Sequence, residues 1–94
     1  MRFRQDVHRK DSNHKDVVEQ LERAGCDVLD LSGVGGGCPD ILVRKGPKMA
    51  LVEIKAGSAR MRPKQIDFQR RWPVHVVRCP EHVQQLIDQF RGAR

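Results

Sequence analysis

Two short apolar segments joined by a turn constrain the fold of this chain more than any other feature. Residues 40–45 read DILVRK, residues 49–55 read MALVEIK, and a Gly-Pro-Lys turn separates them. Strands and turns of this length predict an antiparallel hairpin. Its expected register places Asp40 opposite Glu53. Because strand side chains alternate between the two faces, Glu53 and Lys55 should point the same way.

The rest of the chain alternates helical and strand patterns around this hairpin. A first helix of about three turns is expected after the capping residues Asp11, Ser12 and Asn13, and Gly25 should end it. Strands are expected over 26–31 and 74–78, with helices over 63–72 and from Pro80 onward. The predicted order αβββαβα describes an α/β fold, a small mixed sheet flanked by helices. We expect one domain over residues 1–94, with a basic N-terminal arm at 1–11 that contains Arg2, Arg4, Arg9 and Lys10.

The charge of the chain favours a polyanionic partner. Eighteen Lys and Arg residues oppose 12 Asp and Glu residues, which gives a net charge of +6 and a pI near 9.8. Nucleic acid is the first candidate and an anionic membrane surface the second, while a solvated surface without a partner is the alternative. The candidate DNA-binding residues lie in two groups: Arg60, Arg62 and Lys64 come before Gln65 at the start of the helix at 63–72, and Arg70 and Arg71 lie further along that helix.

Neither a membrane span nor a structural zinc site is expected. No apolar run is long enough to cross a bilayer and no secretion signal is visible, so we expect a cytoplasmic protein. Cys26, Cys38 and Cys79 are irregularly spaced, and Cys79 with His82 forms a single C-x-x-H pair. We therefore predict free thiols in a reducing compartment. Core packing is expected for Trp72, and packing or surface positions for His75 and His82.

The paired carboxylates of the hairpin favour phosphodiester chemistry. Two acids a few ångströms apart suit Mg²⁺, which prefers carboxylate oxygens and polarises a phosphoryl oxygen. Lys55 could orient the attacking water or neutralise charge on the phosphorane. The alternative is an ordinary Glu–Lys surface pair at a sheet edge, or a salt bridge that takes the place of the metal.

The residues Gly37-Cys38-Pro39-Asp40, then Glu53-Ile54-Lys55, then Gln65 resemble the G-x-P-D … E-x-K … Q series of the PD-(D/E)XK nucleases. Within that superfamily the chain looks most like the stand-alone virus-type replication-repair nuclease (VRR-NUC) domain. The archaeal-type Holliday junction resolvases are close relatives. The resemblance covers nearly the whole chain and implies a restriction-endonuclease-like core.

The resemblance implies roles for single residues. Asp40 and Glu53 would be metal ligands, and the backbone carbonyl of Ile54 would complete the site. Lys55 would position the attacking water, and Gln65 would steady a ligand or that water. An exposed helix glutamine is the alternative for Gln65.

Family members often add an acid from the first helix. The candidates here are Asp11, Asp16 and Glu19, of which we favour Glu19, and Asn13 or His14 could replace them.

The resulting expectation is a Mg²⁺- or Mn²⁺-dependent DNA endonuclease for branched DNA or Holliday junctions, in a DNA-repair setting. By resemblance it would act as a homodimer. The alternatives are a nuclease for plain duplex, a catalytically silent DNA-binding module, and a basic adaptor for another protein. The glycine-rich segment 32–39 lacks the residues of a P-loop, and we expect it to allow a close approach beside the site.

Overall fold

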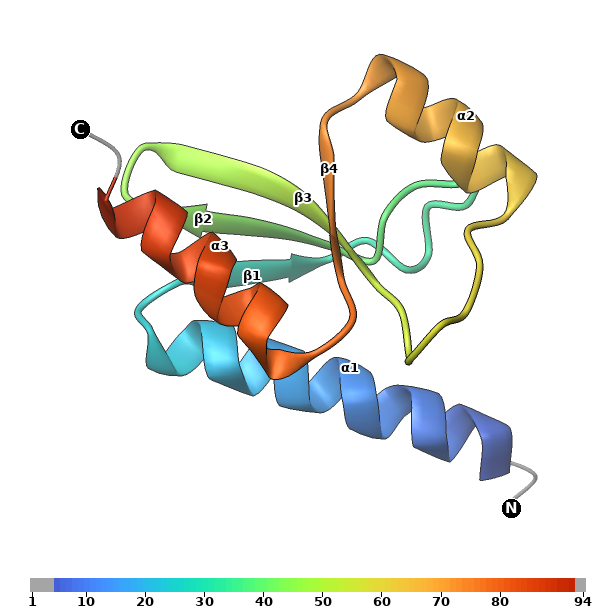
Figure 1. The fold of residues 1–94 in the computed structure, drawn as a ribbon, viewed down its shortest axis with the longest axis horizontal. Helices are drawn as coiled ribbons and strands as arrows, with labels where there is room; N and C mark the ends of the chain where they lie inside the picture. The colour runs from blue at the N-terminus through green and yellow to red at the C-terminus, as the bar shows by residue number, and fades with distance from the viewer. Residues whose placement is uncertain (1–4, 93–94) are drawn as a thin grey trace.

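The computed structural model describes the backbone of residues 5–92 and the side chains of residues 13–92. Its elements follow the predicted order αβββαβα (Figure 1). They are α1 (Gln5–Arg23), β1 (Asp27–Asp30), β2 (Ile41–Lys45), β3 (Lys48–Ile54), α2 (Pro63–Arg71), β4 (Val74–Val77) and α3 (Pro80–Gly92).

Helix α1 begins earlier than the sequence pattern predicted. It starts at Gln5 and runs without interruption through Asp11, Ser12 and Asn13, so these residues are not its N-cap. The predicted arm at 1–11 is therefore wrong for residues 5–11, where Arg9 and Lys10 are helical, while Arg2 and Arg4 lie outside the described residues. The physical reason is that apolar periodicity appears only where a helix meets the core, and polar residues can extend a helix beyond that contact.

The sheet is mixed, as predicted. Its strand order is β1-β2-β3-β4, with two antiparallel pairs followed by a parallel pair between β3 and β4. Ile41 pairs with Val52 and Leu42 with Leu51, so the predicted hairpin register is confirmed. Continuing that register by one residue sets Asp40 beside Glu53.

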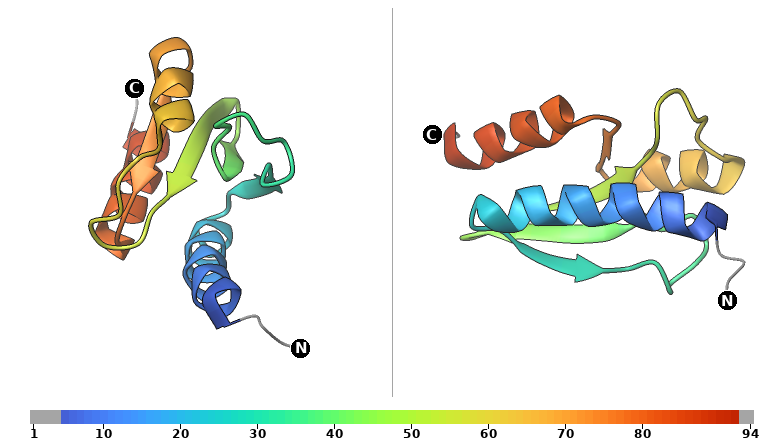
Figure 2. Two further views of the ribbon diagram at one scale, coloured as in Figure 1. Left: turned by 90° about the vertical axis from the view of Figure 1, so that its right-hand side faces the viewer. Right: turned by 90° about the horizontal axis from the view of Figure 1, so that it is seen from below.

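One face of the sheet carries the core. Helices α1 and α3 lie side by side along this face, as Figures 1 and 2 show. The core is aliphatic and draws on both helices and on three of the strands: Val17, Leu21, Ile41, Val43, Ala50, Val52, Val77, Val83, Leu86 and Ile87 are all buried. The opposite face of the sheet has no such cover, and Leu29 and Met49 are exposed there.

Helix α2 lies apart from α1 and α3 (Figure 1) and buries none of its residues. Trp72, which caps its C-terminus, is 53% exposed, so the expectation of core packing is wrong. Trp72 stacks on Phe68 instead, with ring centroids 5.9 Å apart. An apolar period identifies the side of a helix that needs cover, but it does not identify what provides the cover.

Candidate active site

Glu53 is the centre of the candidate site. It lies on β3, between β2 and β4, and only 4% of its surface is exposed. Among the residues whose side chains are described, it is the only buried polar or charged one. Burying a carboxylate is costly unless charges or hydrogen bonds compensate it, so the neighbours of Glu53 define what the site can do.

Asp40 is fixed by both neighbouring strands. Its backbone carbonyl accepts a hydrogen bond from the Leu31 N–H at 2.8 Å, and its Oδ2 accepts one from the Ile54 N–H at 2.8 Å. The second bond crosses the hairpin to the residue after Glu53. The two carboxylates are thus held beside each other by backbone geometry, as the register predicted.

Lys55 and Gln65 both approach the same oxygen of Glu53. The Lys55 Nζ lies 3.7 Å from Glu53 Oε2, and the two side chains are 12% and 6% exposed. Gln65 Nε2 donates a hydrogen bond to Glu53 Oε2 at 3.0 Å, while Gln65 Oε1 accepts one from the Arg62 N–H at 2.8 Å. The structure therefore brings Asp40, Glu53, Lys55 and Gln65 together. The alternatives of an exposed glutamine and a solvated surface pair are wrong.

The electrostatics of this cluster destabilise the charged form of Glu53. Burial, and next the Asp40 carboxylate, raise the pKa of Glu53 from 4.5 to about 7, although Lys55 acts in the opposite direction. Burial also raises the pKa of the Cys38 thiol, and the charges of Glu53 and Asp40 add to this effect. The positive charge of Lys55 therefore does not fully offset the repulsion between the two carboxylates and the cost of burying Glu53.

Gly37 positions the helix that carries Gln65, a role that the sequence did not reveal. Its φ of +83° is in the left-handed region, and an added Cβ would lie 2.3 Å from the Lys64 carbonyl oxygen. The glycine-rich loop therefore packs directly against the first turn of α2. The expected close approach is present, but its partner is the protein's own backbone. The clue in the sequence was the glycine of the G-x-P-D series.

Arg78 is a second residue that sequence reasoning missed. Its Nη1 donates hydrogen bonds to the carbonyl oxygens of Gly57 at 3.0 Å and Ala59 at 2.7 Å. The Lys55 N–H donates to the Val77 carbonyl at 3.0 Å, so the end of β4 holds the chain on both sides of the turn after Lys55. His82 Nδ1 in turn accepts a hydrogen bond from the Arg78 N–H at 2.9 Å.

Glu19, the favoured acid from the first helix, remains outside this cluster. Glu19 faces Arg23 on the same helix, at 3.7 Å, and its side chain is 44% exposed. Within residues 13–92 no group of three or more His, Cys, Asp and Glu side chains is positioned to hold a metal ion. The structure thus brings together two of the predicted carboxylate ligands and does not bring Glu19 to them.

The two carboxylates nevertheless suit a hard divalent cation. Both offer oxygen atoms, the ligand type that Mg²⁺ and Mn²⁺ prefer, and Mg²⁺ normally keeps several waters in place of further protein ligands. A cation would also relieve the repulsion between Glu53 and Asp40 that contributes to the raised pKa of Glu53.

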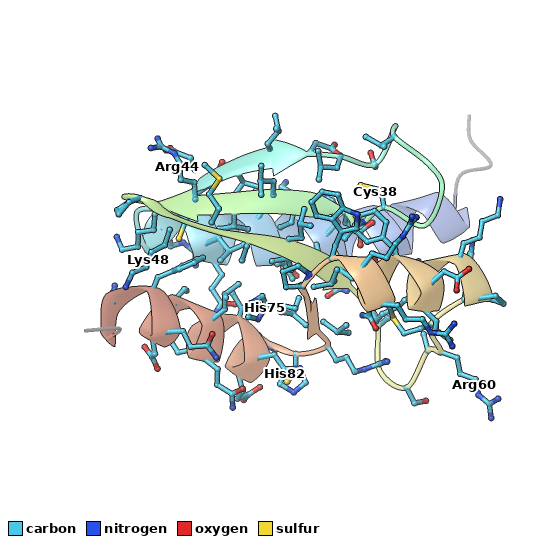
Figure 3. The ribbon with its side chains drawn as sticks, turned by 90° about the horizontal axis from the view of Figure 1, so that it is seen from above. Cys38, Arg44, Lys48, Arg60, His75 and His82 are labelled. Atoms are coloured by element: carbon cyan, nitrogen blue, oxygen red, sulfur yellow. The ribbon has the colours of Figure 1, made fainter. Side chains whose placement is uncertain are left out.

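The predicted DNA-binding residues are exposed. They lie on the loop after Lys55 and on α2: Arg60, Arg62, Lys64, Arg70 and Arg71. Arg60 and Cys38 are at the α2 end of the molecule, whereas Arg44 and Lys48 are at the other end (Figure 3). Arg70 pairs with Asp67 at 3.3 Å, which reduces its availability to a phosphate.

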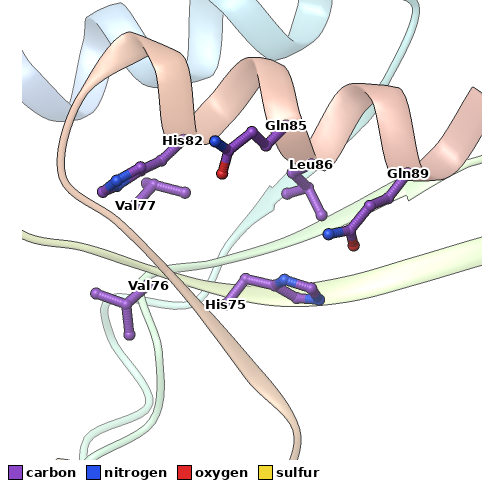
Figure 4. Close-up of a pocket in the computed structure, with 7 residues that line it drawn as sticks. All are labelled: His75, Val76, Val77, His82, Gln85, Leu86 and Gln89. Carbon is purple, nitrogen blue, oxygen red and sulfur yellow. The ribbon is translucent and has the colours of Figure 1, made fainter.

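A pocket of about 230 Å³ lies elsewhere, between β4 and α3, where Leu86 and Gln89 point towards His75 (Figure 4). None of the four clustered residues lines it.

The predicted free thiols are confirmed for Cys26, Cys38 and Cys79.

Among the helices described, none is long and apolar enough to cross a membrane.

Comparison of the chain with protein-family models, with curated proteins and with solved structures found no match.

Proposed function

We propose that this protein is a metal-dependent DNA endonuclease that hydrolyses phosphodiester bonds at the Asp40–Glu53 pair. The observation that carries the proposal is the burial of Glu53, 4% exposed, beside a second carboxylate. Burying two adjacent carboxylates lowers the stability of the fold, and carboxylates with perturbed pKa values cluster at functional sites. The arrangement therefore favours a role in binding or chemistry. The resemblance to the PD-(D/E)XK nucleases, and to VRR-NUC domains in particular, rests on the same residues.

Each member of the cluster has a distinct part in this proposal. Asp40 and Glu53 would hold the cation, and by the family resemblance the Ile54 carbonyl would be a third ligand. When bound, Mg²⁺ or Mn²⁺ polarises the phosphoryl oxygen and lowers the pKa of a nearby water. Lys55 lies 3.7 Å from Glu53 and orients the attacking water or stabilises the phosphorane. Gln65 fixes the Glu53 carboxylate through its 3.0 Å hydrogen bond.

The exposed Arg and Lys side chains beside the cluster bind the DNA backbone in this proposal. Arg60, Arg62 and Lys64 precede Gln65 and can contact phosphates, which carry little sequence information. We propose branched DNA, including four-way junctions, as the substrate, because the resolvase-like resemblance implies it. Plain duplex is the alternative substrate for the same chemistry.

The test is a cleavage assay with Mg²⁺ or Mn²⁺ on four labelled substrates: a four-way junction, a flap, a single strand and a duplex. We expect Lys55→Ala and Asp40→Asn to reduce the cleavage rate by at least roughly a hundredfold, because each removes a group that acts on the transition state. Asp88→Asn is the matched control, since Asp88 is exposed on α3 and accepts a hydrogen bond from Gln84 on the same helix. Absence of cleavage of all four substrates by the wild type would contradict the proposal.

A silent DNA-binding module is the competing function. It predicts that the wild type binds DNA with the same affinity as Lys55→Ala and cleaves nothing. The low exposure of the Lys55 side chain, 12%, favours the enzyme, because a lysine used only to bind phosphate would lie at the surface.

A further inference from the structure

Two aromatic rings lie outside the hydrophobic core at the C-terminal end of α2. The Phe68 and Trp72 rings stack with an interplanar angle of 21°. Phe68 is half-buried, whereas 53% of Trp72 is exposed. Because α2 stands away from α1 and α3 (Figure 1), neither of those helices covers the indole. We call the Phe68 and Trp72 rings the stacking platform.

The ring of Trp72 is oriented before any ligand binds. Its backbone N–H donates a hydrogen bond to the Phe68 carbonyl at 2.9 Å, and its ring stacks on the Phe68 ring. The next residue is Pro73, which restricts the backbone on that side. A ring that is already oriented loses little conformational entropy on binding, so the platform suits a planar ligand that stacks on it.

Two cations share the stripe of α2 that carries Phe68. Lys64, Phe68 and Arg71 are spaced i, i+4 and i+7, which places them along one side of the helix. Lys64 and Arg71 are exposed, and among the described residues neither side chain makes an ion pair or a hydrogen bond. Arg70 differs, because it pairs with Asp67 at 3.3 Å. The stripe thus combines a stacking surface with two positive charges that can contact phosphates.

A nucleic-acid strand with unpaired bases fits this combination. Proteins bind single strands through aromatic rings that stack on bases and through cations that contact the backbone. In a duplex, neighbouring bases cover both faces of each internal base, so stacking on the platform requires a base that has left the duplex. An anionic membrane fits less well, because Ile66 lies roughly 200° around the helix from Phe68 and the apolar side chains of α2 form no single face.

We propose that the stacking platform binds an unpaired base of a DNA strand whose phosphates contact Lys64 and Arg71. This binding deepens the proposed nuclease function and rests on it for the choice of DNA. Trp72 lies seven residues beyond Gln65, or about 10 Å along the helix axis. Since Gln65 contacts Glu53, the stacked base would lie a few nucleotides from the scissile phosphate. Among branched substrates, those with an unpaired arm, such as a flap, are therefore favoured.

The only tryptophan of the chain reports on this contact directly. Metal-free protein in a chelator is titrated with a single strand, with a strand of equal length in which abasic sites replace the bases, and with a duplex. We expect the single strand to quench the emission of Trp72 and to bind at least about fivefold more tightly than the abasic strand, because only bases can stack. The abasic strand and the duplex should bind through their phosphates with little change in emission.

Variants at exposed positions of α2 and at its C-terminus locate the contact, with binding followed by the anisotropy of dye-labelled strands. Trp72→Leu should lose the preference for bases over abasic sites, and Trp72→Phe should retain most of it. Lys64→Ala should weaken binding of both strands by a similar factor and lower the salt dependence by about one phosphate contact. Ile66→Ala is the matched control, because Ile66 is 42% exposed on the same helix but lies off the stripe. It should change neither quantity.

Three results would overturn the proposal. They are equal binding of the two strands by the wild type, unchanged Trp72 emission at saturation, and a base preference that persists in Trp72→Leu with an unchanged circular dichroism spectrum. An emission shift with phosphatidylserine vesicles, or with rising protein concentration alone, and no response to the single strand would also overturn it.

The nuclease proposal is tested separately by cleavage. A base preference without cleavage contradicts the nuclease proposal alone, and cleavage without a base preference contradicts the stacking proposal alone.

Discussion

The two faces of the sheet differ in what they contain. The face under α1 and α3 is filled by aliphatic side chains, among which Leu21, Ile41 and Val52 have no exposed surface. The other face holds the buried Glu53 and several apolar residues, of which Leu29 and Met49 are exposed and Leu42 and Leu51 are half-buried. Stability and proposed function are therefore separated by face, since two consecutive residues of β3, Val52 and Glu53, point to opposite faces and serve the two purposes.

The largest effect on stability should come from the covered face. Leu21→Ala should lower the free energy of unfolding by about 3 to 4 kcal/mol, because it removes a fully buried side chain and leaves a cavity. Leu29→Ala, on the uncovered face and 58% exposed, should cost less than about 1 kcal/mol in the monomer. Urea unfolding of dilute protein measures both. Equal losses of unfolding free energy in the two variants would show that the two faces do not differ in their contribution to stability.

Glu53 should make the metal-free protein less stable as pH rises. Its pKa is 4.5 in the unfolded chain and about 7 in the fold, so the folded state binds more protons between these values. The contribution of Glu53 to stability is therefore largest below pH 4.5, falls as pH rises, and is smallest above about pH 7, with a total change of at most ~3 kcal/mol.

Glu53→Gln sharpens this prediction. The variant keeps an amide close to Gln65 but cannot ionise, so unfolding in a chelator should show a flatter pH profile and a more stable variant above about pH 7. A wild-type profile that rises between about pH 5 and about pH 7 would contradict the account, because it would mean that the carboxylate is stabilised in its charged form.

Gly37→Ala should detach the first turn of α2. The added Cβ would lie 2.3 Å from the Lys64 carbonyl oxygen, and φ is +83°, so we expect a loss of about 2 kcal/mol and faster hydrogen exchange in α2. Gly35→Ala is the matched control, because it shares a positive φ of 81° but meets no atom within 4 Å. Similar exchange in the two variants would show that the contact does not position Gln65.

Arg78→Ala should have the smallest effect. It removes two hydrogen bonds to the carbonyls of Gly57 and Ala59, both exposed, and should cost less than about 1 kcal/mol. Its signature should be faster hydrogen exchange over residues 57–59 and partial rescue by Arg78→Lys. Arg23→Ala, which removes an exposed pair with Glu19, should not change this loop.

The sequence was most informative where periodicity and register decide the outcome. The period of two in residues 40–45 and 49–55 determined which side chains share a face, so the meeting of Asp40, Glu53 and Lys55 could be predicted. The approach of Gln65 followed from the motif and not from periodicity.

Other features depended on contacts that a pattern does not contain. The N-terminal turns of α1 lie beyond the apolar period, and the exposure of Trp72 depends on what covers α2. Gly37 and Arg78 act through backbone carbonyls of Lys64, Gly57 and Ala59, which any sequence provides. Side-chain patterns therefore could not identify these partners.

We propose that Asp40 and Glu53 together hold a divalent cation. Calorimetric titration of metal-free protein with Mn²⁺ above about pH 7, where Glu53 is ionised, measures this directly. We expect a saturable site in the wild type and in Asp88→Asn, and binding at least about tenfold weaker in Glu53→Gln and Asp40→Asn. Equal binding by all four proteins, or none by the wild type, would contradict it.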